Sequence, residues 1–173
     1  VQACPKQGEL VTTSSMGELW VAGTTASADF PVTQGAFQTA LTGVDDGFVV
    51  SGDEVLAQTK NGKQAMNLGA NDEAVVAAPV EGDFVAVIGD NRKLLLFPLE
   101  ELPEMARGRG VVLQRYKDGG LADAKTFTRK EGLTWSAGAG RVRTEANIKD
   151  WIGKRAQAGR LPPTGFPRSG KFG

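Results

Sequence analysis

Apolar residues in this chain fall into short runs that are separated by Gly, Pro, Asn and Asp. Runs of this length, bounded by turn residues, predict strands. They cover residues 19–23, 48–50, 74–80, 84–89, 94–97, 111–116, 121–128 and 132–136. Residues 148–151 predict a single helical turn, and the chain shows no long apolar helical stripe. The pattern therefore predicts an all-β protein.

A unit of strand, acidic turn, basic loop and strand recurs along the chain. Its first strands begin at Phe48, Leu94 and Val142, about 46 to 48 positions apart. Acidic turns follow at residues 53–55, 102–104 and 148–150, and basic residues follow those turns at Lys60 and Lys63, at Arg107 and Arg109, and at Lys154 and Arg155. A period of 40 to 50 residues built from short strands is typical of propeller blades. We expect β-propeller or β-pinwheel-like blades, about three to four in this chain.

Residues 107–110 read Arg-Gly-Arg-Gly and lie between the apolar runs 94–97 and 111–116. Glycines let a ligand approach the backbone closely, and the guanidinium fork matches phosphate oxygens in two parallel hydrogen bonds. The sequence therefore indicates a loop suited to a polyanion. The alternative is a solvated hairpin tip with no ligand.

The formal net charge is zero, but the charges are segregated. Residues 1–106 hold five Lys and Arg against fifteen Asp and Glu, whereas residues 107–173 hold fifteen against five. Such segregation favours nucleic acid as a partner of the basic part, unless folding interleaves the two halves and neutralises them. The residues predicted to contact duplex DNA are Lys60, Lys63, Arg107, Arg109, Lys154, Arg155 and Arg160.

Several chemistries are disfavoured by composition. The chain has no His and one Cys, so we expect no internal disulfide, no His/Cys metal site, no His-based catalysis and no cofactor. No apolar run approaches the ~20 residues of a membrane span, and no signal-peptide pattern is present. We expect a cytoplasmic protein. Because the first residue is Val1, we also expect a fragment or a processed piece.

Residues 17–50 resemble the bacterial SBBP-type β-propeller repeat, in which V-x-G-x-T, D-F-P-x-T-x-G-A-F-Q and D-x-F-V recur in each blade. The pattern is met by Val21, Gly23, Thr25, Asp29, Phe30, Pro31, Thr33, Gly35, Ala36, Phe37, Gln38, Asp46, Phe48 and Val49. The resemblance covers about one blade. It implies that Phe30 and Phe37 are core residues and bind no ligand.

From about residue 47 to residue 173 the chain resembles the C-terminal domain of the A subunit of bacterial DNA topoisomerase IV, close kin of the gyrase A domain. The resemblance is carried by residues 53–68, 89–127, 132–141 and 151–173, the last of which is similar to alphaproteobacterial members. It implies a β-pinwheel, in which neighbouring blades exchange strands, and a basic rim that binds and bends DNA. The implied partners are duplex DNA and the rest of the A subunit.

Two departures from that family change the expectation. The gyrase A box Q-R-R-G-G-K-G is reduced here to a remnant at residues 106–110, so strong chiral wrapping of DNA is not expected. The catalytic region of the A subunit, with its tyrosine nucleophile and metal-assisted cleavage, is absent. Tyr116 is the only tyrosine, and we predict that it lies in a strand and is not that nucleophile. The chain is then not an enzyme by itself.

The two resemblances divide the chain into a lead-in (1–16), an SBBP-like blade (17–50), pinwheel blades (51–160) and a basic Pro/Gly-rich extended tail (161–173). Their junction at Gly47–Phe48 indicates an engineered chimera, with a natural insertion as the alternative. A structural hybrid propeller with no retained ligand is the alternative function. A partial ring leaves sheet edges exposed, so we also expect a homo-oligomer.

Overall fold

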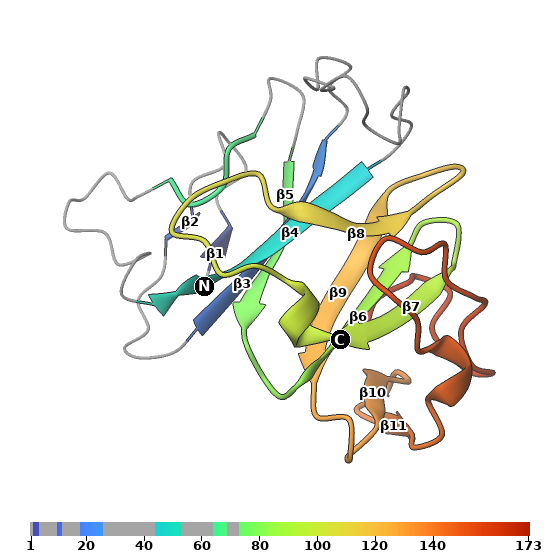
Figure 1. Ribbon diagram of the computed structural model, residues 1–173. Coiled ribbons are helices and arrows are strands. Elements are labelled where there is room, and N and C mark those ends of the chain that lie inside the picture. The colour runs from blue at the N-terminus through green and yellow to red at the C-terminus, as the bar shows by residue number, and fades with distance from the viewer. Residues whose placement is uncertain (1, 4–9, 12–17, 26–43, 53–63, 69–72) are drawn as a thin grey trace.

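The computed structural model describes residues 2–3, 10–11, 18–25, 44–52, 64–68 and 73–173. Strands dominate these residues, together with two short 3-10 helices (Figure 1). The elements are β1 (Gln2–Ala3), β2 (Leu10–Val11), β3 (Glu18–Thr25), β4 (Val44–Ser51), β5 (Glu73–Pro79), β6 (Phe84–Gly89), β7 (Leu94–Pro98), η1 (Leu99–Glu101), β8 (Val111–Arg115), β9 (Leu121–Phe127), β10 (Leu133–Ser136), β11 (Val142–Glu145) and η2 (Lys149–Trp151). The all-β prediction is confirmed, and η2 is the predicted helical turn.

The strands of the described residues form four sheets. The largest has the order β5-β3-β4-β8, the second has the order β7-β6-β9, and β10-β11 and β1-β2 are two-stranded. All paired strands are antiparallel. Strand β3 pairs with β4 along its whole length and with β5 on its other side, so the SBBP-like segment contributes two strands to the largest sheet. Phe30 and Phe37 lie outside the described residues.

The predicted repeat corresponds to a repeated hairpin. Strands β3 and β4, β6 and β7, and β10 and β11 pair as antiparallel neighbours, and each second strand is one of the three equivalent segments found in the sequence. Strands β4 and β7 contain apolar runs, whereas β11 reads Val-Arg-Thr-Glu and was recognised by its spacing from the other two. The repeat therefore describes real structural units.

In two successive units, the segment that follows the hairpin pairs with the second strand of the preceding unit. After η1, Glu104 forms a parallel bridge with Val49, and β8 then pairs antiparallel with β4. After η2, Ile152 forms a parallel bridge with Leu96, and Arg160 pairs antiparallel with Leu94 in β7. This repeated path is the strand exchange that the resemblance to a β-pinwheel implied.

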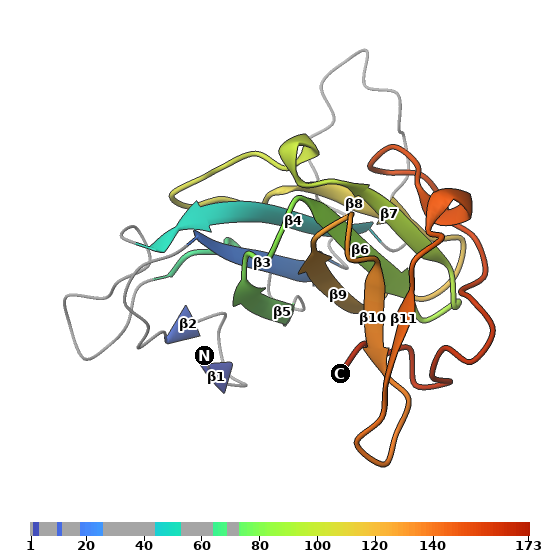
Figure 2. The same cartoon turned by 90° about the horizontal axis from the view of Figure 1, so that it is seen from below.

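Strand exchange corrects one alternative from the sequence. Strands β7 and β8 flank the Arg-Gly-Arg-Gly loop, but they lie in different sheets, since β7 pairs with β6 and β8 pairs with β4 (Figures 1 and 2). The loop at residues 107–110 is therefore a crossover between sheets and not a hairpin tip.

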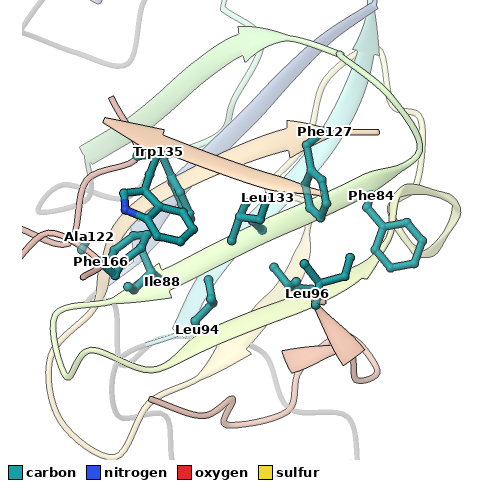
Figure 3. Packing of buried hydrophobic residues seen from close by; sticks show 12 residues of the cluster. Phe84, Ile88, Leu94, Leu96, Ala122, Phe127, Leu133, Trp135 and Phe166 are labelled. Atoms are coloured by element: carbon teal, nitrogen blue, oxygen red, sulfur yellow. The ribbon is translucent and has the colours of Figure 1, made fainter. Parts of the chain in front are cut away.

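The second sheet supplies most of the core. All six residues of β6 are buried, as expected for a central strand with both faces covered. On one face Ile88, Leu94 and Leu96 pack toward Leu133 and Trp135 (Figure 3). On the other face a second cluster forms, to which the sheet contributes Val85, Val87, Leu95, Phe97, Leu121 and Ala124. Phe97 and Trp135, which lie in two of the predicted strands, are 0% and 3% exposed.

The C-terminal segment is not the extended tail that its Pro/Gly-rich composition predicted. Phe166 and Phe172 are 5% and 4% exposed and belong to the same core cluster as Trp135. The Trp135 Nε1–H donates to the carbonyl of Gly165 at 3.3 Å, and the Ser136 N–H donates to the carbonyl of Phe172 at 2.7 Å. These two aromatic side chains and the two hydrogen bonds together hold an otherwise irregular segment against the core.

Candidate nucleic-acid interface

The Arg107–Gly110 loop is fixed to a neighbouring segment of backbone. The Gly108 N–H donates to the carbonyl of Ala65 at 3.2 Å, and the Asn67 N–H donates to the carbonyl of Gly108 at 2.8 Å. Gly108 is buried, whereas Arg107 is exposed. The backbone of this basic loop is therefore anchored while its first guanidinium faces solvent.

The Arg107 guanidinium is held by two amide side chains. Its Nε–H donates to Oδ1 of Asn67 and its Nη2 donates to Oε1 of Gln64, both at 2.9 Å. These partners are neutral, so they orient the guanidinium without cancelling its charge. Two of the five N–H donors of arginine are used in this way. An exposed, oriented cation of this kind is suited to a phosphate oxygen, because less side-chain freedom is lost on binding.

Gly110 ends the loop where it meets β4. Its φ is +91°, and a Cβ built there would lie 2.6 Å from the carbonyl oxygen of Gly47. Both the backbone conformation and the close approach require glycine at this position. Arg109, one residue earlier, is half-buried and interacts with other groups of the protein. The pair Arg107 and Arg109 thus consists of one exposed and one partly covered side chain.

Arg155 has a structural role at the same place. Its Nη1 donates to the carbonyl of Val112 at 2.6 Å, and its N–H donates to the Glu101 carboxylate at 2.7 Å. It therefore joins η1 to the start of β8, directly after the Arg107–Gly110 loop. Arg107 and Arg155 are equivalent by structure, since each lies three residues beyond the parallel bridges at Glu104 and Ile152.

The remaining predicted contact residues are placed as follows. Lys154 is exposed, with its N–H donating to Oε1 of Gln157 at 3.2 Å. Arg160 is exposed, and its backbone pairs in both directions with Leu94 at 2.7 and 2.9 Å. Lys60 and Lys63 lie outside the described residues. The structure brings Arg107, Arg109 and Arg155 to one end of β8 and leaves Arg160 beside the start of β7.

Sequence reasoning missed Gln64 and Asn67 altogether. They lie 43 and 40 positions from Arg107, and neutral amides carry no motif or charge signal. Exposed cations were also missed at Arg115 and Lys117, at the far end of β8 from the loop. Their omission follows from choosing residues by repeat position, because neither belongs to the repeated basic loop.

A buried acid lies on the strands that hold this interface. Asp45, in β4, is 1% exposed, and Tyr116, directly after β8, is 6% exposed. Burial raises the pKa of Asp45 to about 7, and the nearby Asp46 and Asp90 carboxylates add to this effect. Burial and the adjacent Asp45 raise the pKa of Tyr116. Tyr116 is thus a core residue next to a strand end, close to its predicted position in the strand.

Metal-binding clusters and membrane-spanning helices are both absent from the described residues. Among them, no group of three or more His, Cys, Asp and Glu side chains is arranged to hold a metal ion. None of the helices in the described part is long and apolar enough to cross a membrane.

Comparison with known protein families finds a match that begins at residue 47 and ends at residue 121. Residues 47–81 and 83–121 match the family described as DNA gyrase C-terminal domain, beta-propeller. The A subunit of DNA topoisomerase 4 from Rickettsia bellii is 49% identical over 129 residues, which are 75% of this chain and 17% of the relative. The same protein from Caulobacter vibrioides is 50% identical over 126 residues, 73% of this chain and 16% of the relative. The chain thus spans about a sixth of the length of these relatives.

The fold also resembles that of a solved domain. The structure of the E. coli ParC C-terminal domain aligns with a TM-score of 0.61 at 19% identity, over 90% of this chain and 59% of that one. At this identity the likeness supports the fold. It extends the similarity to most of the chain, whereas the family match begins at residue 47.

Proposed function

We propose that this chain, which from residue 47 onward resembles the C-terminal domain of the A subunits of DNA topoisomerase IV and gyrase, is a non-catalytic accessory region that binds and bends duplex DNA. The observation that carries the proposal is the exposed Arg107 guanidinium, oriented by Gln64 and Asn67 on an anchored loop of the family-matched region. Catalysis in the parent enzyme then belongs to other parts of its A subunit.

The contacts would be made mainly to phosphates. Arg107, Arg109 and Lys154 lie on loops and not on a helix or ribbon shaped for a groove, so base reading contributes little. Affinity then comes from counterions released as each phosphate is neutralised. Arg155, tied to Val112 and Glu101, supports the loop more than it reaches outward.

Replacing Arg107 and Arg109 together by glutamine should weaken duplex binding about equally for unrelated sequences. Each lost phosphate contact should lower the slope of log K against log salt by about 0.9. If two contacts are lost, affinity at 0.1 M salt falls about sixtyfold on the same relation. The measurement is fluorescence anisotropy of a labelled duplex of about 30 base pairs over a series of salt concentrations.

The matched control is Lys130→Gln with Lys149→Gln, which removes the same charge from two other exposed positions. It should change the slope much less. A slope equal to that of the native chain in the Arg107/Arg109 variant would remove this loop from the interface. No duplex binding by the native chain would favour the alternative, a structural hybrid propeller with no retained ligand.

The whole enzyme supplies the other partners in this proposal. The relatives are about six times longer than the matched region, so the rest of the A subunit is the expected covalent neighbour of such a domain. A DNA-binding accessory region would act in the bacterial cytoplasm, where the chromosome lies. The SBBP-like segment and the chimera remain a prediction from the sequence.

We also propose that the chain self-associates through an open sheet edge. Strand β11 pairs only with β10 among the described residues, and its first residue, Val142, is 70% exposed. An unpaired edge with an exposed apolar side chain favours pairing with a second copy. Sedimentation velocity from about 1 to 100 μM should show a concentration-dependent dimer, and Val142→Lys should weaken it. A strictly monomeric profile over that range would contradict the proposal.

A further inference from the structure

A hollow of about 400 Å³ lies between the β10–β11 hairpin and the C-terminal segment. Its lining includes Ser136, Ala137 and Gly138 from the hairpin, and Gly165, Ser169 and Lys171 from the C-terminal segment. The hairpin projects from the molecule at a place well separated from the crossover into β8 in both views (Figures 1 and 2). The hollow is therefore distinct from the Arg107 loop.

The side chains of the two segments that wall this hollow carry only positive charge, and one carboxylate, that of Asp123, lies behind them against the Phe172 N–H. Residues 136–143 and 165–173 contain Arg141, Arg143, Arg168 and Lys171 and no Asp or Glu. All four cationic residues are exposed. Arg143 lies across Gly165, since a Cβ built on that glycine would fall 1.9 Å from the Arg143 Nη1. A guanidinium thus lies directly against the C-terminal turn that forms one wall.

The hairpin tip offers its backbone to a ligand. Gly138, Ala139 and Gly140 all have positive φ, at 80°, 51° and 71°, and the Arg141 N–H closes the turn on the Gly138 carbonyl at 3.0 Å. A Cβ at Gly138 or Gly140 would meet nothing within 4 Å. Left-handed backbone at Ala139 is an unfavourable conformation for a residue that has a Cβ. Open glycine backbone beside cationic side chains is the combination that phosphate sites use.

The opposite wall is held in place by the core. Trp135 precedes the hairpin tip, and its ring lies 5.4 Å from that of Phe166. Figure 3 shows these two side chains close together. The Phe166 ring in turn lies 5.3 Å from that of Phe172. The Lys171 Nζ donates to the carbonyl of Ala122, and the Phe172 N–H donates to the Asp123 carboxylate at 2.8 Å. Lys171 is thereby positioned before any ligand binds, and its N–H donates to the Ser169 Oγ at 3.4 Å.

We infer that this hollow binds a phosphate group of duplex DNA and is a second contact, separate from the Arg107 loop. Arg143, which lies against Gly165 of the lining, supplies charge together with Arg141, which directly follows the glycine tip. The glycine backbone of the tip allows close approach, and Ser136 and Ser169 of the lining supply further hydrogen bonds. The inference rests on the proposed function. Contacts at two separated places on one rigid core would fix the direction in which DNA crosses the domain.

The test compares three double variants in the salt titration described above: Arg141→Gln with Arg143→Gln, Arg107→Gln with Arg109→Gln, and the control Lys130→Gln with Lys149→Gln. The control residues flank the hairpin at the end away from its tip: Lys130 precedes β10 and Lys149 follows β11. Loss of at least one phosphate contact at the hollow should lower the slope by about 0.9 and the affinity about eightfold at 0.1 M salt.

A second measurement locates the ligand. Backbone amide chemical shifts of Gly138, Gly140 and Ser169 are followed by NMR while the duplex, or inorganic phosphate at equal ionic strength, is added. We expect the chemical shifts of these amides to change when duplex is added to the native chain, and to stay unchanged in the Arg141/Arg143 variant. Shifts with inorganic phosphate but not with duplex would overturn the assignment to DNA.

The two proposals fail in different ways. A native slope in the Arg141/Arg143 variant, together with a reduced slope in the Arg107/Arg109 variant, would overturn the second contact and keep the proposed function. A reduced slope only in the Arg141/Arg143 variant would support the hollow and remove the Arg107 loop. Absence of duplex binding by the native chain would overturn both.

Discussion

Replacing Phe166 and Phe172 together by alanine is expected to lower the free energy of unfolding by about 5–8 kcal/mol. Each ring is nearly fully buried, and a single Phe→Ala change in a core costs about 3–5 kcal/mol. The rings lie 5.3 Å apart, so the two losses overlap and add to less than their sum. The total free energy of unfolding of a domain of this size is about 5–15 kcal/mol. The double variant should therefore be largely unfolded at physiological temperature.

Thermal and urea unfolding, followed by circular dichroism and Trp fluorescence, measure this effect. The matched control is Leu161→Ala in the same segment, because Leu161 is 64% exposed and contributes its backbone carbonyl, not its side chain, to Trp151. The control should stay within about 0.5 kcal/mol of the native chain. A double variant as stable as the control would mean that residues 161–173 are the extended tail predicted from composition.

The second large effect concerns Asp45 and pH. Burial raises the pKa of Asp45 from 3.8 to about 7, so between these values the folded state holds a proton that the unfolded chain has released. Stability should therefore fall as pH rises from about 4 to 7 and level off above that. The difference between these two pKa values corresponds to a contribution of about 4 kcal/mol, to which other groups add their own pH dependence.

Asp45→Asn should be more stable than the native chain at about pH 8 by a few kcal/mol, because the amide resembles the protonated carboxyl and carries no charge to bury. The advantage should shrink as pH falls and vanish near pH 4. Urea unfolding at about pH 5, 6, 7 and 8 gives the two curves. Asp118→Asn, at an exposed turn, is the control and should follow the native curve. An Asp45 variant with the same pH dependence as the native chain would contradict the assignment.

The sequence identified the strands but could not assign their partners. Apolar runs predicted β4, β6, β7, β8 and β9 because burial of side chains leaves a local pattern. The partner of β8 was missed, since nothing in Val111–Arg115 distinguishes pairing with β4 from pairing with β7. Sheet membership depends on the path of the whole chain. The resemblance to a β-pinwheel implied that strands are exchanged between blades, but it did not identify β4 as the partner of β8.

The basic loop was predictable in part for a similar reason. Arg107 and Arg109 carry a motif of charge and glycine, which is visible in sequence, whereas Gln64 and Asn67 act only through their position in space. The cations around the hollow lack such a motif, and their grouping depends on how the C-terminal segment folds back. The composition of that segment predicted a tail, because two phenylalanines scarcely change the average composition of a Pro/Gly-rich stretch. Their burial could therefore not be predicted.

The exchange of β8 affects how the chain folds during synthesis. The free side of β4 is filled only when residues 111–115 have been made, about sixty residues after β4 itself. At about 5–20 residues per second this edge stays unpaired on the ribosome for several seconds. The free edge of β7 likewise stays unpaired until residues 152–160 have been made. Because each unit is completed by a later segment, the nascent chain always carries an unpaired strand edge, first at β4 and then at β7. A pause in translation just before β8 would prolong the exposure of the β4 edge and favour misassembly.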